Sequence, residues 1–189
     1  EVVRRGREAN ELKLRYHNEL EKRVGEQTSL ISSLLEFSNR LNAAQTLEEA
    51  VELLLETLNS MVSCKRISIL LETPETGQVA VAEALGLPPG IERKPINLED
   101  SPVVRRVMEA GEVLYVEDVE EAGLASGRGK GKAFLSVPLL DSTAAKKAVF
   151  GVVNLTDRDG DGEFTDTERR LVQSIADTAS IACANLRNR

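Results

Sequence analysis

Seven positions spaced alternately by four and three residues mark the first part of the chain. They are Leu20, Val24, Gln27, Ile31, Leu34, Ser38 and Leu41. No proline and only Gly25 interrupts the stretch from Glu8 to Leu41. This heptad-like spacing predicts a long helix with one seam that is mainly apolar. Because the first half of this helix has no core of its own, we expect a parallel homodimer held mainly by residues 12–41; a single solvated helix is the alternative.

Two shorter helices have recognisable ends. Thr46 and Glu49 form a predicted capping box, and apolar residues follow at helical spacing to about Val62. Further along, Ser101 is predicted as an N-cap before a proline at the first helical position, and Gly111 closes this segment. The sequence therefore predicts helices at about 47–62 and 102–110.

Five runs of β-branched or apolar residues, separated by turn residues, predict strands. They are 66–72, 77–85, 112–118, 133–140 and 148–155. A last helix begins near Thr165 and carries Cys183 on its apolar face. The order predicts an α+β fold, in which helices from both ends of the chain cover one face of an antiparallel sheet. The opposite face is left to the middle segment.

The composition narrows the possible partners. A formal charge of −7 argues against general nucleic-acid binding, which depends on cations that neutralise phosphates. No apolar stretch approaches the roughly 20 residues that span a bilayer, so we expect no membrane insertion in this segment. Two cysteines among apolar residues favour buried thiols in a reducing compartment. We therefore expect a cytoplasmic protein whose partners are small molecules or proteins.

The segment from about Leu34 to Leu186 resembles a GAF domain, the small-molecule sensing module of bacterial signalling proteins and cyclic-nucleotide phosphodiesterases. The resemblance rests on the order and spacing of SLLEFSNRLNAAQTLEEAVELLLETL, RISILLE, SPVVRRVMEAGEVLYVEDV, FLSVPLL and VFGVVNLTDRDGDGEFTDTERRLVQSIADTASIACANL. It implies a GAF-like α/β/α sandwich around a central antiparallel sheet, preceded by a long helix. We expect a coiled-coil-like connector helix at 1–33 and a sensory domain at 34–189.

The resemblance also implies a function. We expect a non-catalytic sensor that binds an unidentified small molecule and relays its presence through the terminal helices of a dimer to an output domain absent from this chain. The middle helix and its loops would roof the pocket, with Ile96, Val103, Val107, Asp118, Phe134 and Ser136 as the expected pocket residues. Since the chain begins without methionine and ends on a charged helix, we expect a segment of a longer protein. The alternative is a structural dimerisation module with a vestigial pocket filled by its own side chains.

The distribution of histidine and cysteine excludes several chemistries. The sole histidine, His17, lies in the N-terminal helix, which excludes a Cys/His or Ser/His/Asp site within the domain and haem held by a pocket histidine. Cys64 is predicted to precede the first strand, and Cys183 lies on the last helix. These positions disfavour a GAF-like methionine sulfoxide reductase and bilin attachment. We therefore expect no enzyme activity, no haem and no bilin.

Two further motifs concern nucleotides and phosphate. Cyclic-nucleotide-binding GAF domains carry an Asn-Lys, Phe, Asp-Glu signature near the last strand and helix. The corresponding residues are Asp157, Arg158, Phe164, Glu168 and Arg169, of which only Phe164 matches, so nucleotide binding is in doubt. Segment 123–132 alternates glycine with basic residues from 127 to 132, but it is not followed by the helix or Lys-Ser/Thr pair of a phosphate loop. It predicts a mobile pocket lid instead.

The segment DRDGDGEFTDTE at 157–168 matches the calcium-loop template position by position. The predicted ligands are Asp157, Asp159, Asp161, the Glu163 carbonyl and Glu168. Against this, Thr165 and Glu168 also form a capping box for the last helix, and GAF domains commonly have a polar turn here without metal. Two interpretations therefore remain open: a stabilising calcium site, or a turn that binds magnesium or no metal and ends in a helix cap.

Overall fold

The computed structural model describes residues 2–73, 76–88, 90, 91, 94–119, 121–124, 133–142, 148–158 and 162–188, with the backbone alone for 2–9 and Arg158. Two compact units divide the chain, residues 1–39 and 40–189. The division falls within the first helix, a few residues after the predicted boundary at residue 33.

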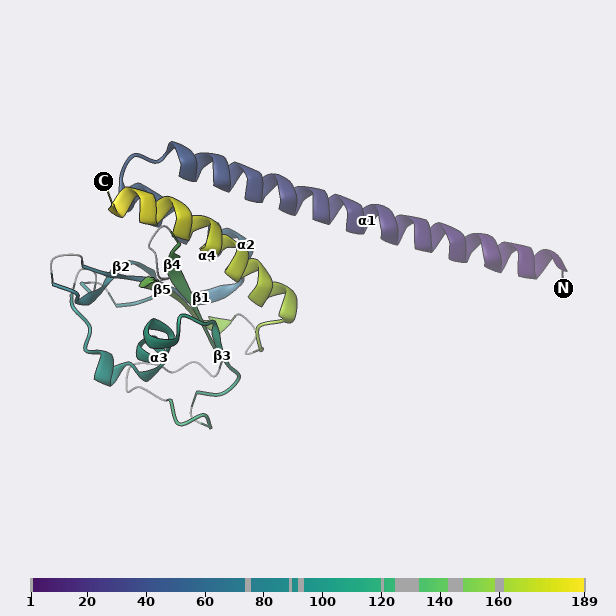
Figure 1. Cartoon of the computed structure of the whole chain (residues 1–189). Helices are drawn as coiled ribbons and strands as arrows, with labels where there is room; N and C mark the ends of the chain where they lie inside the picture. The colour runs from purple at the N-terminus through teal and green to yellow at the C-terminus, as the bar shows by residue number, and fades with distance from the viewer. Residues whose placement is uncertain are drawn as a thin grey trace. The chain divides into compact units, whose positions relative to one another are not determined.

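The first unit is helical throughout its described length. Helix α1 spans Val2–Ala43, so the predicted long helix is confirmed (Figure 1). Every described side chain from Asn10 to Ser33 is exposed. The exposed large apolar side chains on this helix are between 37% and 70% exposed, and they are Leu12, Leu14, Tyr16, Leu20, Val24, Leu30, Ile31 and Leu35, whereas Phe37 and Leu41 near its end are buried. Among the described residues, no helix of the chain is long and apolar enough to cross a membrane.

The second unit is built on one antiparallel sheet. Its strands are β1 (Cys64–Glu72), β2 (Val79–Leu85), β3 (Leu114–Val116), β4 (Phe134–Asp141) and β5 (Ala148–Arg158), in the order β2-β1-β5-β4-β3. Helices α2 (Leu47–Met61) and α4 (Asp166–Arg187) cover one face, and α3 (Pro102–Ala110), preceded by the 3-10 turn η1 (Leu98–Asp100), covers the other (Figure 1). The predicted α+β sandwich is confirmed.

The face of the sheet toward α2 and α4 is apolar. Alternate residues of a strand point to opposite sides, and one cross-strand row on this side is Ile67, Leu155, Leu135 and Tyr115. The Arg169 guanidinium of α4 lies 4.3 Å from the centre of the Tyr115 ring, which identifies the side. The three aliphatic residues are 0% exposed, and each contributes about 1.5–3 kcal/mol by its burial. Rows of this kind hold the two helices on the sheet.

Helices α2 and α4 begin where the sequence predicts. At α4, the Thr165 side chain accepts from the Glu168 N–H at 3.2 Å and the Glu168 carboxylate accepts from the Thr165 N–H at 2.8 Å, which completes the capping box. At α2, Thr46 accepts from the Glu49 N–H at 3.2 Å. The Glu49 carboxylate accepts from the preceding Gln45 N–H at 2.8 Å instead of from Thr46. Local hydrogen bonding therefore fixes both starts.

Helix α3 departs from its predicted cap. Ser101 precedes the helix, but its hydroxyl makes no hydrogen bond to a helix N–H. Pro102 has no N–H, and Arg105 donates to the Ser101 carbonyl at 3.0 Å. The N–H groups of Val103 and Val104 consequently have no partner among the described residues. The first turn of α3 therefore keeps two backbone N–H groups available as hydrogen-bond donors.

Two strands are longer than predicted. β1 begins at Cys64, which was expected to precede it, and β5 continues to Arg158 instead of ending at Leu155. The reason is that Cys64 pairs with Arg158 in the antiparallel ladder. The extension places Asp157, the first residue of the calcium-loop motif, inside a strand.

Both cysteines are free and buried, as expected from their apolar surroundings. Burial raises the pKa of the Cys183 thiol to about 12, so this thiol stays protonated at neutral pH. A buried, protonated thiol is a poor nucleophile.

Candidate functional site

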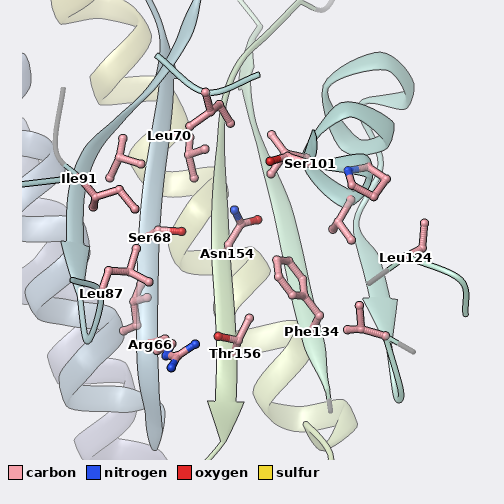
Figure 2. A pocket seen from close by; sticks show the side chains of 17 residues that line it. Arg66, Ser68, Leu70, Leu87, Ile91, Ser101, Leu124, Phe134, Asn154 and Thr156 are labelled. Atoms are coloured by element: carbon pink, nitrogen blue, oxygen red, sulfur yellow. The ribbon is translucent and has the colours of Figure 1, made fainter. Parts of the chain in front are cut away.

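A cavity of about 160 Å³ lies between the sheet and α3 (Figure 2). Its floor is formed by β1, β5 and β4, and its walls by α3 and the segments that follow β2 and β3. The apolar lining residues, apart from Ile67, whose side chain lies in the row on the opposite face of the sheet, are Leu70, Val81, Leu87, Ile91, Ile96, Pro102, Val103, Val104, Val119, Leu124 and Phe134. The polar ones are Arg66, Ser68, Ser101, Asn154 and Thr156. A mostly apolar wall with a few polar groups is typical of small-molecule pockets.

The polar groups of the floor follow from the strand register. Arg66 of β1 is opposite Thr156 of β5, and Ser68 is opposite Asn154. Two adjacent cross-strand pairs therefore present four polar side chains on one face of the sheet. Figure 2 shows these side chains in a strip across the two strands. We call these four residues the polar strip.

Asn154 is the most deeply buried member of the polar strip. It is 6% exposed, and its Oδ1 accepts a hydrogen bond of 2.7 Å from the Ser136 hydroxyl, which is itself 0% exposed. This bond orients the amide and leaves its Nδ2 group without a partner among the described residues. The Asn154 Nδ2 group is therefore an open hydrogen-bond donor in the lining of the cavity.

Arg66 is the charged member of the strip and stands at one end of it (Figure 2). Its Nε lies 3.0 Å from Asp157 Oδ2, with the two side chains 32% and 21% exposed. Asp157 has a φ of 53°, a left-handed conformation that few residues other than glycine adopt. The pair occupies the Nε edge of the guanidinium, and the other N–H groups have no partner among the described residues. The cavity thus has a cation at its edge that a carboxylate already holds in place.

Three of the six expected pocket residues line this cavity, and they are Ile96, Val103 and Phe134. Val107, 1% exposed, lies further along α3 in an apolar cluster with Leu70 and Val152. Ser136 is not in the wall but beside it, where it holds Asn154. Of the strands that form the floor, only β4 contributes an expected residue to the lining, and none of the expected residues lies on β1 or β5.

Asp118, the sixth expected residue, supports the wall from outside. Its carboxylate accepts from the Glu121 N–H at 3.1 Å, and its carbonyl accepts from the Ala122 N–H at 3.0 Å. The turn that these bonds form continues into a bond of 3.0 Å between the Leu124 N–H and the Val119 carbonyl. Val119 and Leu124 line the cavity, so Asp118 positions residues of its wall. Asp118 itself is absent from the lining of the described chain.

Sequence reasoning missed the polar strip. The signal was present in RISILLE and VVNLT, where polar residues alternate with apolar ones in strands that read as core elements. Arg66 and Ser68 share one face of β1, as Asn154 and Thr156 do on β5. Polar residues at alternate positions beneath a covering helix mark a cavity, but this inference requires knowing that β1 pairs with β5.

The residues that correspond to the cyclic-nucleotide signature lie outside the cavity lining of the described chain. Phe164, 1% exposed, meets Tyr115 edge to face with ring centres 6.4 Å apart. Arg169 covers the same ring, and Glu168 caps α4. These residues stabilise the start of α4. The predicted lid falls mainly on residues 125–132, which lie outside the described residues.

Two of the predicted calcium ligands contact other protein groups in the structure. Asp157 pairs with Arg66, and the Glu168 carboxylate accepts from both the N–H and the hydroxyl of Thr165 at 2.8 Å. Glu163 is exposed, while Asp159 and Asp161 lie outside the described residues. In the described part of the chain, no three His, Cys, Asp or Glu side chains are grouped to hold a metal ion. A calcium ion in this loop would compete with Arg66 for Asp157 and with Thr165 for Glu168.

The calcium site stays a prediction, and a calorimetric titration decides it. Chelator-stripped protein is titrated with calcium beside a variant that carries Asp157→Ala and Glu168→Gln. A site at 157–168 predicts saturable heat from the parent and about tenfold or more weaker binding by the variant, because two ligand carboxylates are lost. No heat at millimolar calcium, or equal heat from both proteins, would leave only a polar turn and a helix cap.

The fold and the cavity together define a class of protein: an α/β/α module with a small pocket between a middle helix and the central sheet. Residues 44–184 match the family model described as GAF domain. The chain belongs to the GAF domain family. No curated protein sequence matches it significantly.

Solved structures agree with this assignment. The GAF domain of an Acinetobacter phosphoenolpyruvate-protein phosphotransferase superposes with a TM-score of 0.70 at 15% identity, over 84% of this chain and 94% of that one. The corresponding Coxiella burnetii domain gives 0.71 at 16% identity, over 84% and 95%. Residues 122 to 287 of a methyl-accepting chemotaxis protein give 0.69 at 18%, over 80% and 97%. At these identities the likeness shows the fold alone: a GAF domain resembling those of signalling proteins.

Proposed function

We propose that the chain is a non-catalytic sensory domain of a larger signal-transduction protein. It binds a small molecule in the cavity between α3 and the sheet and relays this binding through the terminal helices of a parallel homodimer. The observation that carries the proposal is the cavity of about 160 Å³, with the Asn154 Nδ2 group, which has no partner among the described residues, on its floor. A vestigial pocket would be filled by its own side chains. A dry cavity of about 150 Å³ is large enough to bind benzene.

The lining favours binding over catalysis. Its described part contains no histidine, cysteine, aspartate or glutamate. General acid–base catalysis and an activated nucleophile both require such groups within hydrogen-bond reach of each other. His17 belongs to α1, and the Cys183 thiol is buried with a raised pKa. The described groups of the cavity can hold a molecule and orient it.

The α1 seam favours a second copy of the chain as its partner. Val24 and Ile31 occupy one set of seam positions, and Leu20 and Leu34 the other. β-Branched residues at the first set with leucine at the second favour a parallel two-stranded coiled coil. Leu20, Val24 and Ile31 are 41%, 61% and 58% exposed, so a single chain leaves this seam in water. Pairing two copies in register would bury it.

Polar contacts connect α4 to the strands of the cavity floor. The Leu140 N–H of β4 donates to the Ser180 hydroxyl at 3.1 Å, and Ser180 is 4% exposed. At the end of β1, Glu72 lies 3.2 Å from the Arg187 guanidinium of α4. A ligand that shifts β1 or β4 would therefore move the contacts of α4. These bonds give the relay a physical route from the cavity to a terminal helix.

A thermal-shift screen with a metabolite library tests the proposal. The parent is compared with Ser68→Leu, which fills the floor of the cavity, and with Ser63→Leu, the same change at an exposed residue before β1. We expect at least one compound to raise the melting temperature of the parent and of Ser63→Leu by several degrees, since a ligand at 100 times its Kd stabilises by about 2.7 kcal/mol. Ser68→Leu should lose the effect. No active compound, or equal shifts in all three proteins, would contradict cavity binding.

A further inference from the structure

We infer that the cavity takes a small organic carboxylate with a compact apolar body. This inference rests on the proposed function and adds the chemical class of the ligand. It depends on three features of the wall: the kind of polar group that is left open, the start of α3, and the shape of the apolar part.

The open polar groups of the described wall are donors. The Arg66 guanidinium and the Asn154 Nδ2 group only donate, and the hydroxyls of Ser68, Thr156 and Ser101 can donate. No carboxylate belongs to this part of the wall. An ionised carboxylate is an acceptor without donors, and its bonds to N–H groups are about twice as strong as neutral ones. The set of donors therefore matches a carboxylate better than an amine or an alcohol.

The start of α3 adds a second positive element. Ser101, Pro102, Val103 and Val104 all line the cavity, and the N–H groups of both valines lack partners among the described residues. The N-terminus of a helix carries partial positive charge and binds anions through such groups. Asn154, independently, is more than nine-tenths buried and presents an open amide to the same cavity. Arg66, Asn154 and Ser101 all line this cavity, and Figure 2 shows Asn154 between the other two in this view.

The rest of the wall fits a compact apolar body. Leu87 and Ile91 stand on one side of the strip, and Phe134 and Leu124 on the other (Figure 2). The volume of about 160 Å³ is close to that of a cavity that holds one benzene ring. A monocyclic or short branched acid fits these dimensions.

The ion pair of Arg66 supplies a diagnostic feature of carboxylate binding. Asp157 holds the Nε edge of the guanidinium at 3.0 Å and partly neutralises its charge. A bound carboxylate would share this cation with Asp157. Loss of the Arg66 charge should therefore weaken binding, while loss of the Asp157 charge should strengthen it. A neutral ligand would show neither effect.

Calorimetry on the full chain tests the inference with matched probes. The probes are benzoate, phenylacetate and 4-methylpentanoate, each beside its primary amide, together with benzylamine. We expect at least one acid to bind, with its amide about tenfold or more weaker and the amine without measurable binding. Arg66→Gln should weaken the acid about 10- to 100-fold, and Asp157→Asn should strengthen it about threefold or more.

Lys65→Gln is the matched control, because this neighbouring residue is exposed and absent from the cavity lining. It removes the same charge and should leave the affinity within about twofold, since exposed charges are screened by salt. The carboxylate assignment would be overturned if the amides or the amine bound as tightly as the acids. If this binding were also lost in Ser68→Leu, the result would still support small-molecule binding in the cavity. Equal affinity of the acid for Arg66→Gln and the parent would also overturn the carboxylate assignment. If neither the probes nor any library compound binds, the proposed function fails as well.

Discussion

Replacement of both Val24 and Ile31 by aspartate is expected to convert a dimer of this chain into a monomer. Each dimer would lose four apolar side chains from its seam, each worth about 1.5–3 kcal/mol when buried. Aspartates facing one another in a parallel pair also repel. The summed loss of about 6 kcal/mol or more corresponds to a dissociation constant raised at least about 10,000-fold. Sedimentation velocity at micromolar concentration distinguishes the two species.

A matched variant controls for charge. Ser32→Asp together with Ser33→Asp adds the same charge to exposed positions that lie off the seam. We expect this variant to remain dimeric. Circular dichroism should show that both variants keep the helices of the folded domain. A monomeric parent, or a Val24→Asp, Ile31→Asp protein that sediments as a dimer, would refute the coiled-coil account.

Gly86→Ala is expected to destabilise the domain by about 3 kcal/mol or more. Gly86 follows β2 with a φ of 71°, and a Cβ there would lie 1.9 Å from the Lys65 carbonyl oxygen. That oxygen belongs to the backbone of β1, so relief requires the two strands to separate. Leu87, the next residue, lines the cavity, and the same shift would distort the binding site. Urea unfolding at fixed protein concentration measures the loss.

Gly90→Ala isolates the cause of this loss. Gly90 has a φ of 79°, and a Cβ there would meet no atom within 4 Å. Only the strain of a left-handed alanine remains, about 1 kcal/mol. The difference between the two variants therefore measures the clash with β1. Equal losses would mean that the close approach of Gly86 to Lys65 does not contribute.

The elements of this fold were predictable because their signals are local. Thr165 and Glu168 form the predicted capping box, and Gly111 ends α3 in a left-handed conformation with a φ of 66°. Ser101 is the exception. Its type and position predict a cap, yet its hydroxyl makes no capping hydrogen bond and the residue lines the cavity. Local chemistry identified where the helix starts but not what the side chain does there.

The floor of the site was not predictable because it depends on pairing between distant strands. The bond between Ser136 and Asn154 and the pairing of Ser68 with Asn154 join three strands that no local pattern brings together. The same cause applies to Asp157. A spacing motif assigns this residue to a metal, whereas the pairing of β1 with β5 brings it to Arg66. Spacing along the chain identifies residue types but not the partners that compete for them.

Native mass spectrometry of the full chain, purified without denaturation, tests the central claim most directly. The account predicts a dimer whose mass exceeds that of two bare chains by one small molecule per chain. The added mass should be lost on denaturation and should be absent from Ser68→Leu. Bare-chain mass for the parent, even after incubation with every compound that raises its melting temperature, would contradict the claim that this cavity holds a ligand.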